Sequence, residues 1–338
     1  MQIRENISLR PFNSFGIDAT ARYFTTFTSE AELQEILASP LVSHHPPLVL
    51  GGGSNILLTK DLPNLVLKNE IGGIAVVLED DEYIYLKAGA GVNWHQLVLY
   101  CVSNNFAGME NLSLIPGNVG ASPMQNIGAY GVEIKDIFHS LDAFHMADKK
   151  GVTFSLKDCA FGYRESVFKR KYKGQFVITS VTYRLRKQPS FETGYGAVQQ
   201  ELERMGLKEL SIQAISEAVI NIRKSKLPDP KEVGNAGSFF KNPQVNIAHF
   251  EQLREVYPSL PFFPFDENHV KVPAGWLIEQ CGWKGVRRGD AGCYPKQALV
   301  LVNYGNASGD EIYQLSEEIL LSVRKKFGIS LEREVNIL

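Results

Sequence analysis

The chain has 338 residues, more than one hydrophobic core usually serves, so two or three domains are expected. Apolar residues make up 44% and charged residues 21%, as in an average soluble globular protein, which excludes long disordered tracts. The formal charge is −2 and the basic residues are scattered, which excludes a nucleic-acid-binding face.

The cysteines and the N-terminal sequence indicate the compartment. The four cysteines lie far apart and form no CxxC pair, which favours isolated thiols in a reducing compartment over a disulfide framework or a zinc site. The first residues lack the basic-then-apolar order of a secretion signal, and no run approaches the roughly 18 apolar residues of a membrane span. We therefore expect a cytoplasmic protein that contacts neither membrane nor nucleic acid.

The first third of the chain combines a helix with short strands. Ser29 and Glu32 form a capping-box pattern that predicts a helix, and Pro40, Pro46 and Pro47 then break the chain. The stretch "LVLGGGSNILLTKDLPNLVL" (residues 48–67) places glycines between two short apolar runs. Strand, turn, strand is therefore the predicted order.

The middle of the chain is rich in predicted strands. Five β-rich runs occupy residues 71–185, with one helical segment at residues 92–105. Residues 207–226 have the apolar spacing of a helix, and the Pro- and Gly-rich stretch Leu227–Gly237 predicts a domain boundary after it.

The C-terminal region predicts one long helix and a final strand. Apolar residues recur at helical spacing from Ile312 to Phe327, and Gly328 supplies a C-cap. The last stretch, "LEREVNIL" (residues 331–338), is predicted as a terminal strand.

Two glycine-rich segments suit a phosphate-bearing ligand. In "GGGSN" (Gly51–Asn55) the glycines let backbone N–H groups approach a phosphate closely. No GK[ST] follows, and the GxGxxG order is missing, which excludes a P-loop and a Rossmann fingerprint. A tight hairpin turn is the alternative interpretation.

The second segment, "LSLIPGNVGASPMQNIGAYG" (Leu112–Gly131), concentrates backbone and side-chain donors in one loop. A purely structural crossover is the alternative, because glycine-rich loops also serve tight packing. Two such loops in one chain together favour a dinucleotide ligand.

Nine sequence blocks carry a resemblance to a known family. The chain resembles the UDP-N-acetylenolpyruvoylglucosamine reductases, also called UDP-N-acetylmuramate dehydrogenases, over nearly its whole length. The blocks, in the family's order, are "NSFGI", "GGGSN", "IPGNVGASPMQNIGAYG", "FGYRES", "KLPDP", "GNAGSFFKNP", "AGWLIEQCG", "QALVLVN" and "LEREV".

The resemblance implies an α+β fold, with an FAD-binding fold of the vanillyl-alcohol oxidase type made of two α+β subdomains and a C-terminal α/β substrate-binding domain. The subdomains are expected at residues 1–68 and 69–226 and the C-terminal domain at residues 227–329, with residues 330–338 packing back on the first subdomain. FAD is expected to bind noncovalently. The residues matched to FAD binding are Gly52, Gly53, Ser54, Asn55, Gly117, Ser122, Pro123, Asn126, Gly128, Ala129 and Tyr130.

The resemblance also implies the reaction. NADPH reduces FAD, and the flavin passes a hydride to the enolpyruvyl group of UDP-N-acetylglucosamine enolpyruvate, giving UDP-N-acetylmuramate for peptidoglycan synthesis. Ser238 matches the proton donor, and Arg164 and Glu334 match the pair that polarises the substrate carboxylate. Taken without the family, these residues would be a helix cap, a surface ion-pair member and a solvent-facing strand residue.

Substrate contacts follow from the same match. Tyr195 lies in "FETGYG" and resembles the tyrosine of an inserted loop that closes over substrate in one of the family's two types. Family behaviour implies a monomer. The other residues matched to substrate contacts are Arg223, Lys226, Asn242 and Gln297.

Some features depart from the family or stay outside it. Only three residues follow "LEREV", so a flavin contact made by a longer tail in relatives is expected to be lost. The histidines His44, His45 and His95 show no ligand spacing, and no metal is expected. A flavin oxidase acting on another alcohol and a nonenzymatic flavin or nucleotide sensor are the competing functions.

Overall fold

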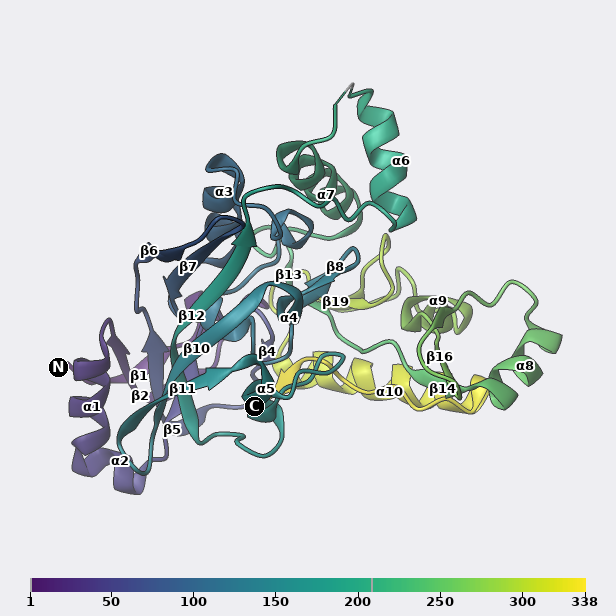
Figure 1. Ribbon diagram of the computed structural model, residues 1–338. Coiled ribbons are helices and arrows are strands. Elements are labelled where there is room, and N and C mark those ends of the chain that lie inside the picture. Colours follow the sequence, from purple (N-terminus) through teal and green to yellow (C-terminus); the bar gives the residue numbers. More distant parts are fainter. Residues whose placement is uncertain (1, 208) are drawn as a thin grey trace. The chain divides into compact units, whose positions relative to one another are not determined.

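The computed structural model describes residues 2–207 and 209–338, which form two compact units (Figure 1). Unit 1 comprises Met1–Ile7, Ala21–Gly53 and Leu62–Ser225. Unit 2 comprises Ser8–Thr20, Ser54–Asp61 and Lys226–Leu338. The three-part division expected from the sequence stays a prediction.

The first layer of unit 1 is a small sheet backed by helices. Its order is β1-β2-β5-β3, with β5 parallel to both β2 and β3, and Phe27, Leu33 and Leu65 lie in the core beneath it. The capped helix is confirmed, because the Ser29 hydroxyl accepts the Glu32 N–H at 3.2 Å. The elements are β1 (Arg4–Ser8), β2 (Thr20–Phe27), α1 (Glu30–Ala38), α2 (Pro40–His44), β3 (Leu48–Leu50) and β5 (Leu62–Asn69).

Pro40 does not simply break the chain, as the sequence predicted, but begins the short helix α2. Proline suits the first turn of a helix because the N–H that it lacks has no partner there.

The larger layer of unit 1 is an antiparallel sheet in the order β11-β10-β12-β7-β6. Its core includes Trp94, Leu97 and Tyr183, which are essentially fully buried. The predicted strands and the helix between them are confirmed. The elements are β6 (Ile74–Glu79), β7 (Tyr83–Gly89), α3 (Trp94–Ser103), α4 (Ile134–Ile137), β10 (Phe138–His145), β11 (Lys150–Ser155), α5 (Leu156–Cys159) and β12 (Phe176–Arg186).

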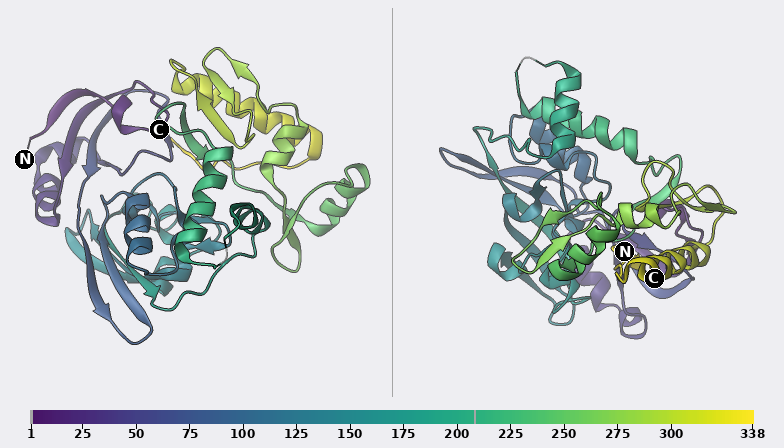
Figure 2. Two further views of the ribbon diagram at one scale, coloured as in Figure 1. Left: turned by 90° about the horizontal axis from the view of Figure 1, so that it is seen from above. Right: turned by 90° about the vertical axis from the view of Figure 1, so that its right-hand side faces the viewer.

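A helix pair completes unit 1. Helix α6 (Gly196–Met205) and helix α7 (Ile212–Lys226) lie side by side in both sets of views, and Val198 packs with Ile215 and Val219 (Figures 1 and 2). The sequence predicted α7 but gave no helix prediction for the region of α6. Only Val198 of α6 is buried, so most of this helix carries no core pattern.

Unit 2 is built on a four-stranded sheet, β13-β19-β18-β17, and a three-stranded sheet, β14-β16-β15. The predicted long helix is confirmed as α10, which packs on β18, β19 and α9 and ends at Gly328 with φ +68°. The elements are β13 (Gly234–Ser238), β14 (Gln244–Asn246), α8 (Ile247–Val256), β15 (Phe263–Pro264), β16 (His269–Lys271), α9 (Ala274–Gln280), β17 (Arg287–Arg288), β18 (Ala291–Cys293), β19 (Val300–Asn303) and α10 (Gly309–Phe327).

The C-terminus pairs with a segment far away in the sequence. Strand β20 (Asn336–Ile337) runs parallel to β4 (Ile56–Leu57), and the Thr59 N–H and hydroxyl both donate to the Leu338 carbonyl. Strands β3 and β4 therefore belong to different sheets, and the tight-hairpin interpretation of "GGGSN" is wrong. Within the described ranges, no helix is both long and apolar enough to cross a membrane.

The first residue of α10 allows a close backbone approach, which gives a stability prediction. A Cβ on Gly309 would lie 1.7 Å from the Leu58 carbonyl oxygen. Gly309→Ala should therefore destabilise the protein by about 1–3 kcal/mol or more, because the backbone must move to admit the methyl group. Urea unfolding followed by circular dichroism measures this change.

Gly196→Ala is the matched control, because Gly196 also begins a helix and its added Cβ would meet nothing within 4 Å. Equal stability of the two variants would contradict the packing argument.

Candidate active site

The two glycine segments singled out in the sequence meet inside unit 1. A Cβ on Gly52 would lie 2.8 Å from the Cα of Gly117 and 3.0 Å from the Asn118 side-chain oxygen. Gly53 and Gly117 have φ values of +63° and +116°, which side chains disfavour. The glycines thus allow two backbones to touch and leave main-chain atoms uncovered by side chains.

The loop of residues 112–131 is fastened along the start of α3. The Gly117 carbonyl accepts the Trp94 N–H at 3.0 Å, and the Val119 N–H donates to the Val92 carbonyl at 2.9 Å. His95 accepts the Leu114 N–H through Nδ1 at 2.9 Å, and burial lowers the pKa of this imidazole. The loop is therefore ordered by its own unit before any ligand binds.

The end of this loop is a hairpin. Strands β8 (Gly128–Ala129) and β9 (Val132–Glu133) are joined by Tyr130 and Gly131, with φ values of +49° and +89°. Positive φ at both central residues is the requirement of a type I′ turn, which matches the twist of paired strands. The turn fixes the place of Tyr130.

Two of the side chains predicted to bind FAD form hydrogen bonds with other residues of unit 1. The Ser122 hydroxyl bonds the Tyr183 hydroxyl at 2.7 Å, and both side chains are buried. The Asn126 amide donates to Glu133 and to the Gly162 carbonyl, both at 3.0 Å, and its oxygen accepts the Lys135 N–H. In this structure these side chains shape the loop. Pro123 is buried beside them.

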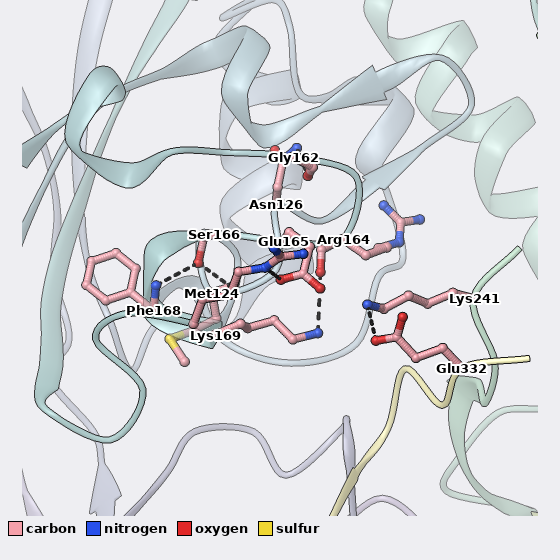
Figure 3. Close-up of polar contacts among 11 residues, drawn as sticks. Met124, Asn126, Gly162, Arg164, Glu165, Ser166, Phe168, Lys169, Lys241 and Glu332 are labelled. Atoms are coloured by element: carbon pink, nitrogen blue, oxygen red, sulfur yellow. Dashed lines mark hydrogen bonds and ion pairs between the residues drawn. The ribbon is translucent and has the colours of Figure 1, made fainter. Parts of the chain in front are cut away.

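Arg164 is held in a defined pose against the same loop (Figure 3). It occupies the turn Gly162–Glu165, which two backbone hydrogen bonds close, and has φ +54°. The Arg164 Nη2 donates to the Gly128 carbonyl at 2.6 Å, and the Lys169 ammonium donates to the Arg164 carbonyl at 3.3 Å. Left-handed backbone at a nonglycine residue is strained and persists only where its surroundings hold it.

A second cluster in unit 1 contains Tyr130, Tyr195 and Arg223. The two tyrosine rings are edge to face with centroids 5.4 Å apart, and Arg223 bonds the Tyr130 hydroxyl. Burial raises the pKa of Tyr130 and lowers that of Arg223, and each side chain opposes the other's shift. A half-buried cation bonded to a tyrosine hydroxyl is suited to an anionic group. Tyr195 itself is 43% exposed at the start of α6.

Unit 2 brings Ser238 and Glu334 onto neighbouring segments. The Glu334 N–H donates to the Phe239 carbonyl at 2.8 Å, and the Lys241 N–H donates to the Glu332 carbonyl at 2.9 Å. Asn55 donates through its side chain to the Glu334 carbonyl at 3.3 Å. Three sequence blocks far apart in the chain therefore form one backbone network in unit 2.

Of the other residues of unit 2 predicted to bind substrate, two lie at the start of α9 and one at the end of α7. The Asn242 oxygen accepts the Ala274 N–H at 2.9 Å, and a Cβ on Gly275 would lie 2.9 Å from the Gln297 oxygen. The structure thus places Asn242 and Gln297 at the start of the same helix, whereas Lys226 is exposed at the end of α7.

Sequence reasoning missed Lys241 and Asn111. Lys241 is only 7% exposed, and its ammonium binds the Glu332 carboxylate at 2.6 Å (Figure 3). Lysine is among the residues least often buried, so the burial of Lys241 had no signal in the sequence. Asn111 is 1% exposed and had no signal in the sequence.

Comparison with known proteins identifies the family. The C-terminal-domain model of UDP-N-acetylenolpyruvoylglucosamine reductase matches residues 229–338, and an FAD-binding-domain model matches residues 21–157. The reductase of Flavobacterium johnsoniae is 50% identical over 339 residues, covering 100% of both chains. The chain belongs to the UDP-N-acetylenolpyruvoylglucosamine reductase family. It is an FAD-containing oxidoreductase.

Further members of the reductase family are similar to this chain over its whole length. The reductase of Amoebophilus asiaticus is 50% identical over 100% of both chains, and that of Pseudomonas putida is 48% identical over 100% of this chain and 99% of its own. The crystal structure of the reductase from Thermus caldophilus shares the fold, with a TM-score of 0.70 at 23% identity over 99% of both chains. The predicted α+β FAD-binding fold is confirmed.

The glycine contact in unit 1 fits an FAD-binding domain, because glycine lets a pyrophosphate approach the backbone with no side chain in the way. Gly52→Ala should weaken FAD binding about 5- to 150-fold, since the new methyl group forces the two backbones apart. The flavin-to-protein absorbance ratio after purification, and FAD titration of stripped protein, measure the change.

Gly51→Ala is the control, because a Cβ there would meet nothing within 4 Å. Full flavin content in Gly52→Ala, or an equal loss in both variants, would contradict this interpretation.

Proposed function

We propose that this chain uses NADPH to reduce the enolpyruvyl group of UDP-N-acetylglucosamine enolpyruvate to UDP-N-acetylmuramate, as a cytoplasmic monomer that supplies peptidoglycan synthesis. The observation that carries the proposal is the backbone network of unit 2, which sets Ser238 and Glu334 on neighbouring segments. That network lies largely in the region that matches the reductase C-terminal domain.

The glycine segments are assigned to FAD. Gly52, Gly53 and Gly117 would hold the pyrophosphate through backbone N–H groups, as their conformations allow. Gly128, Ala129 and Tyr130 would contribute from the hairpin, Ser54 and Asn55 from the residues that follow Gly53, and Ser122, Pro123 and Asn126 by shaping the loop. FAD, when bound, supplies a carrier that accepts hydride from NADPH and gives it to the substrate.

Ser238 is assigned the proton transfer. When the methylene carbon of the enolpyruvyl group gains hydride, the carbon–carbon double bond breaks and its electron pair moves to the neighbouring carbon and the carboxylate. The Ser238 hydroxyl gives its proton to that neighbouring carbon, and the serine regains a proton from solvent. A hydroxyl is a weak acid, so this step requires neighbours that stabilise the oxyanion.

Arg164 and Glu334 are assigned to the substrate carboxylate. A guanidinium binds a carboxylate in two-point geometry, and the Gly128 carbonyl already orients that of Arg164. Glu334 must be protonated, or donate through a bonded proton, to stabilise the enolate.

The nucleotide part of the substrate is assigned to the remaining residues. Tyr195 and Arg223 would meet the diphosphate, because their cluster combines a cation with hydroxyl groups. Lys226, Asn242 and Gln297 are assigned to the same substrate by resemblance.

Anaerobic stopped-flow absorbance tests the serine. NADPH should bleach the flavin of wild type and Ser238→Ala at similar rates, whereas reoxidation by UDP-N-acetylglucosamine enolpyruvate should be about 10²- to 10⁴-fold slower in the variant. The proposal fails if oxygen or a simple alcohol, and not the enolpyruvyl nucleotide, drives reoxidation. A normal reoxidation rate in the variant would remove Ser238 from its role.

The two neighbouring glutamates give a second test. Glu334→Gln should lower kcat by about 10²-fold or more, because the neutral amide cannot move a proton. Glu332→Gln removes the exposed carboxylate that pairs with the buried Lys241 ammonium, so it should cost about 1–3 kcal/mol of stability, while kcat should fall much less than in Glu334→Gln. Steady-state kinetics of both variants test this assignment. A larger kcat loss in Glu332→Gln than in Glu334→Gln would assign the catalytic role to Glu332 instead.

A further inference from the structure

Asn111 joins the turn that carries Tyr130 to the segment that leads to Tyr195. It lies in the 3₁₀ turn Glu110–Leu112 and is 1% exposed. Its amide nitrogen donates to the Tyr130 carbonyl and to the Glu192 carbonyl, both at 2.8 Å. One side chain therefore uses both of its N–H bonds to connect two segments that lie 62 residues apart, since 192 minus 130 is 62.

The other half of this amide has no partner. The Oδ1 of Asn111 is buried and makes no hydrogen bond with any part of the chain that the structure describes. A buried acceptor without a partner is destabilising, and an apolar residue of similar size would avoid that loss. The stabilisation from the two donated hydrogen bonds must therefore exceed the free-energy cost of the unsatisfied oxygen.

The two donors connect a tight hairpin turn with a segment that is largely exposed. Tyr130 and Gly131 have left-handed backbones, with φ values of +49° and +89°. Glu192, Gly194 and Tyr195 are exposed, and the next residue with a fully buried side chain is Val198 in α6. Between β12 and α6, the partly buried Phe191 side chain and the Asn111 bond to Glu192 thus tie a largely exposed segment to the core of unit 1.

We propose that Asn111 is a positioning residue: its amide fixes the base of the Tyr195 segment to the glycine-rich hairpin and so sets the geometry of the Tyr130–Tyr195 pair. This inference rests on the proposed role of Tyr195 in binding the diphosphate of the substrate. Loss of the tie leaves chemistry intact and lets the Tyr195 segment sample other positions, which weakens binding of the nucleotide.

The test uses the FAD-loaded full chain. Asn111→Asp places a carboxylate against two carbonyl oxygens and removes both donors, and Asn111→Ser retains at most one donor if the first variant folds poorly. Hydrogen–deuterium exchange of residues 191–197 should be at least about tenfold faster in Asn111→Asp, with a smaller increase in Asn111→Ser. The KM for the enolpyruvyl nucleotide should rise about tenfold with kcat within about twofold of wild type.

A double-mutant cycle with Tyr195→Ala isolates the mechanism. If Asn111 acts through Tyr195, the Asn111 substitution should not raise KM further when Tyr195 is already absent. Additive effects on KM would overturn the proposal, as would unchanged exchange of residues 191–197.

Asn69→Asp is the matched control, because Asn69 is 5% exposed and also bridges backbone groups of unit 1, donating to Ile178 and accepting from Ile71. It should leave exchange at residues 191–197 unchanged. Equal effects in both Asp variants would make Asn111 merely structural. Faster local exchange in Asn111→Asp, with a normal KM in Tyr195→Ala, would support the tie and refute the substrate role of Tyr195.

Discussion

The backbone contact between Gly52 and Gly117 is the constraint on which the rest of unit 1 depends. A methyl group at Gly52 would lie only 2.8 Å from Gly117, so the chain can hold these segments together only without side chains. The loop that follows is then fixed by main-chain bonds to the start of α3 and ends in a turn with two left-handed residues. A ligand that binds backbone atoms meets a surface that is already ordered, which lowers the entropy lost on binding.

The polar side chains in and beside this loop serve two purposes. Ser122 and Asn126 form buried bonds within unit 1, and Asn111 connects the hairpin with the Tyr195 segment. Arg164 is oriented by a carbonyl of the same hairpin. The main-chain groups proposed to bind FAD and the side chains proposed to bind substrate therefore make contacts with the same hairpin.

Much of the fold was predictable from local patterns. The cap at Ser29, the long apolar stripe of α10 and the β-rich middle of the chain all appear where the sequence indicated. Helix α6 was missed because only Val198 in it is buried. The terminal strand is shorter than expected, because only Asn336–Ile337 pairs with β4, and the residues before it follow the segment after β13.

The sequence by itself determined the family, the cofactor and the candidate residues, because ordered motifs and glycine placement are local properties of the chain. Only the tertiary structure decided which hydrogen-bonding side chains of the Leu112–Gly131 loop bond other residues of the protein, and which distant segments lie together. A count of polar residues in Leu112–Gly131 cannot show that Ser122 bonds Tyr183, nor that Glu334 adjoins Phe239. Such pairings join residues far apart in the sequence, and burial of a polar group requires a partner that only the folded chain supplies.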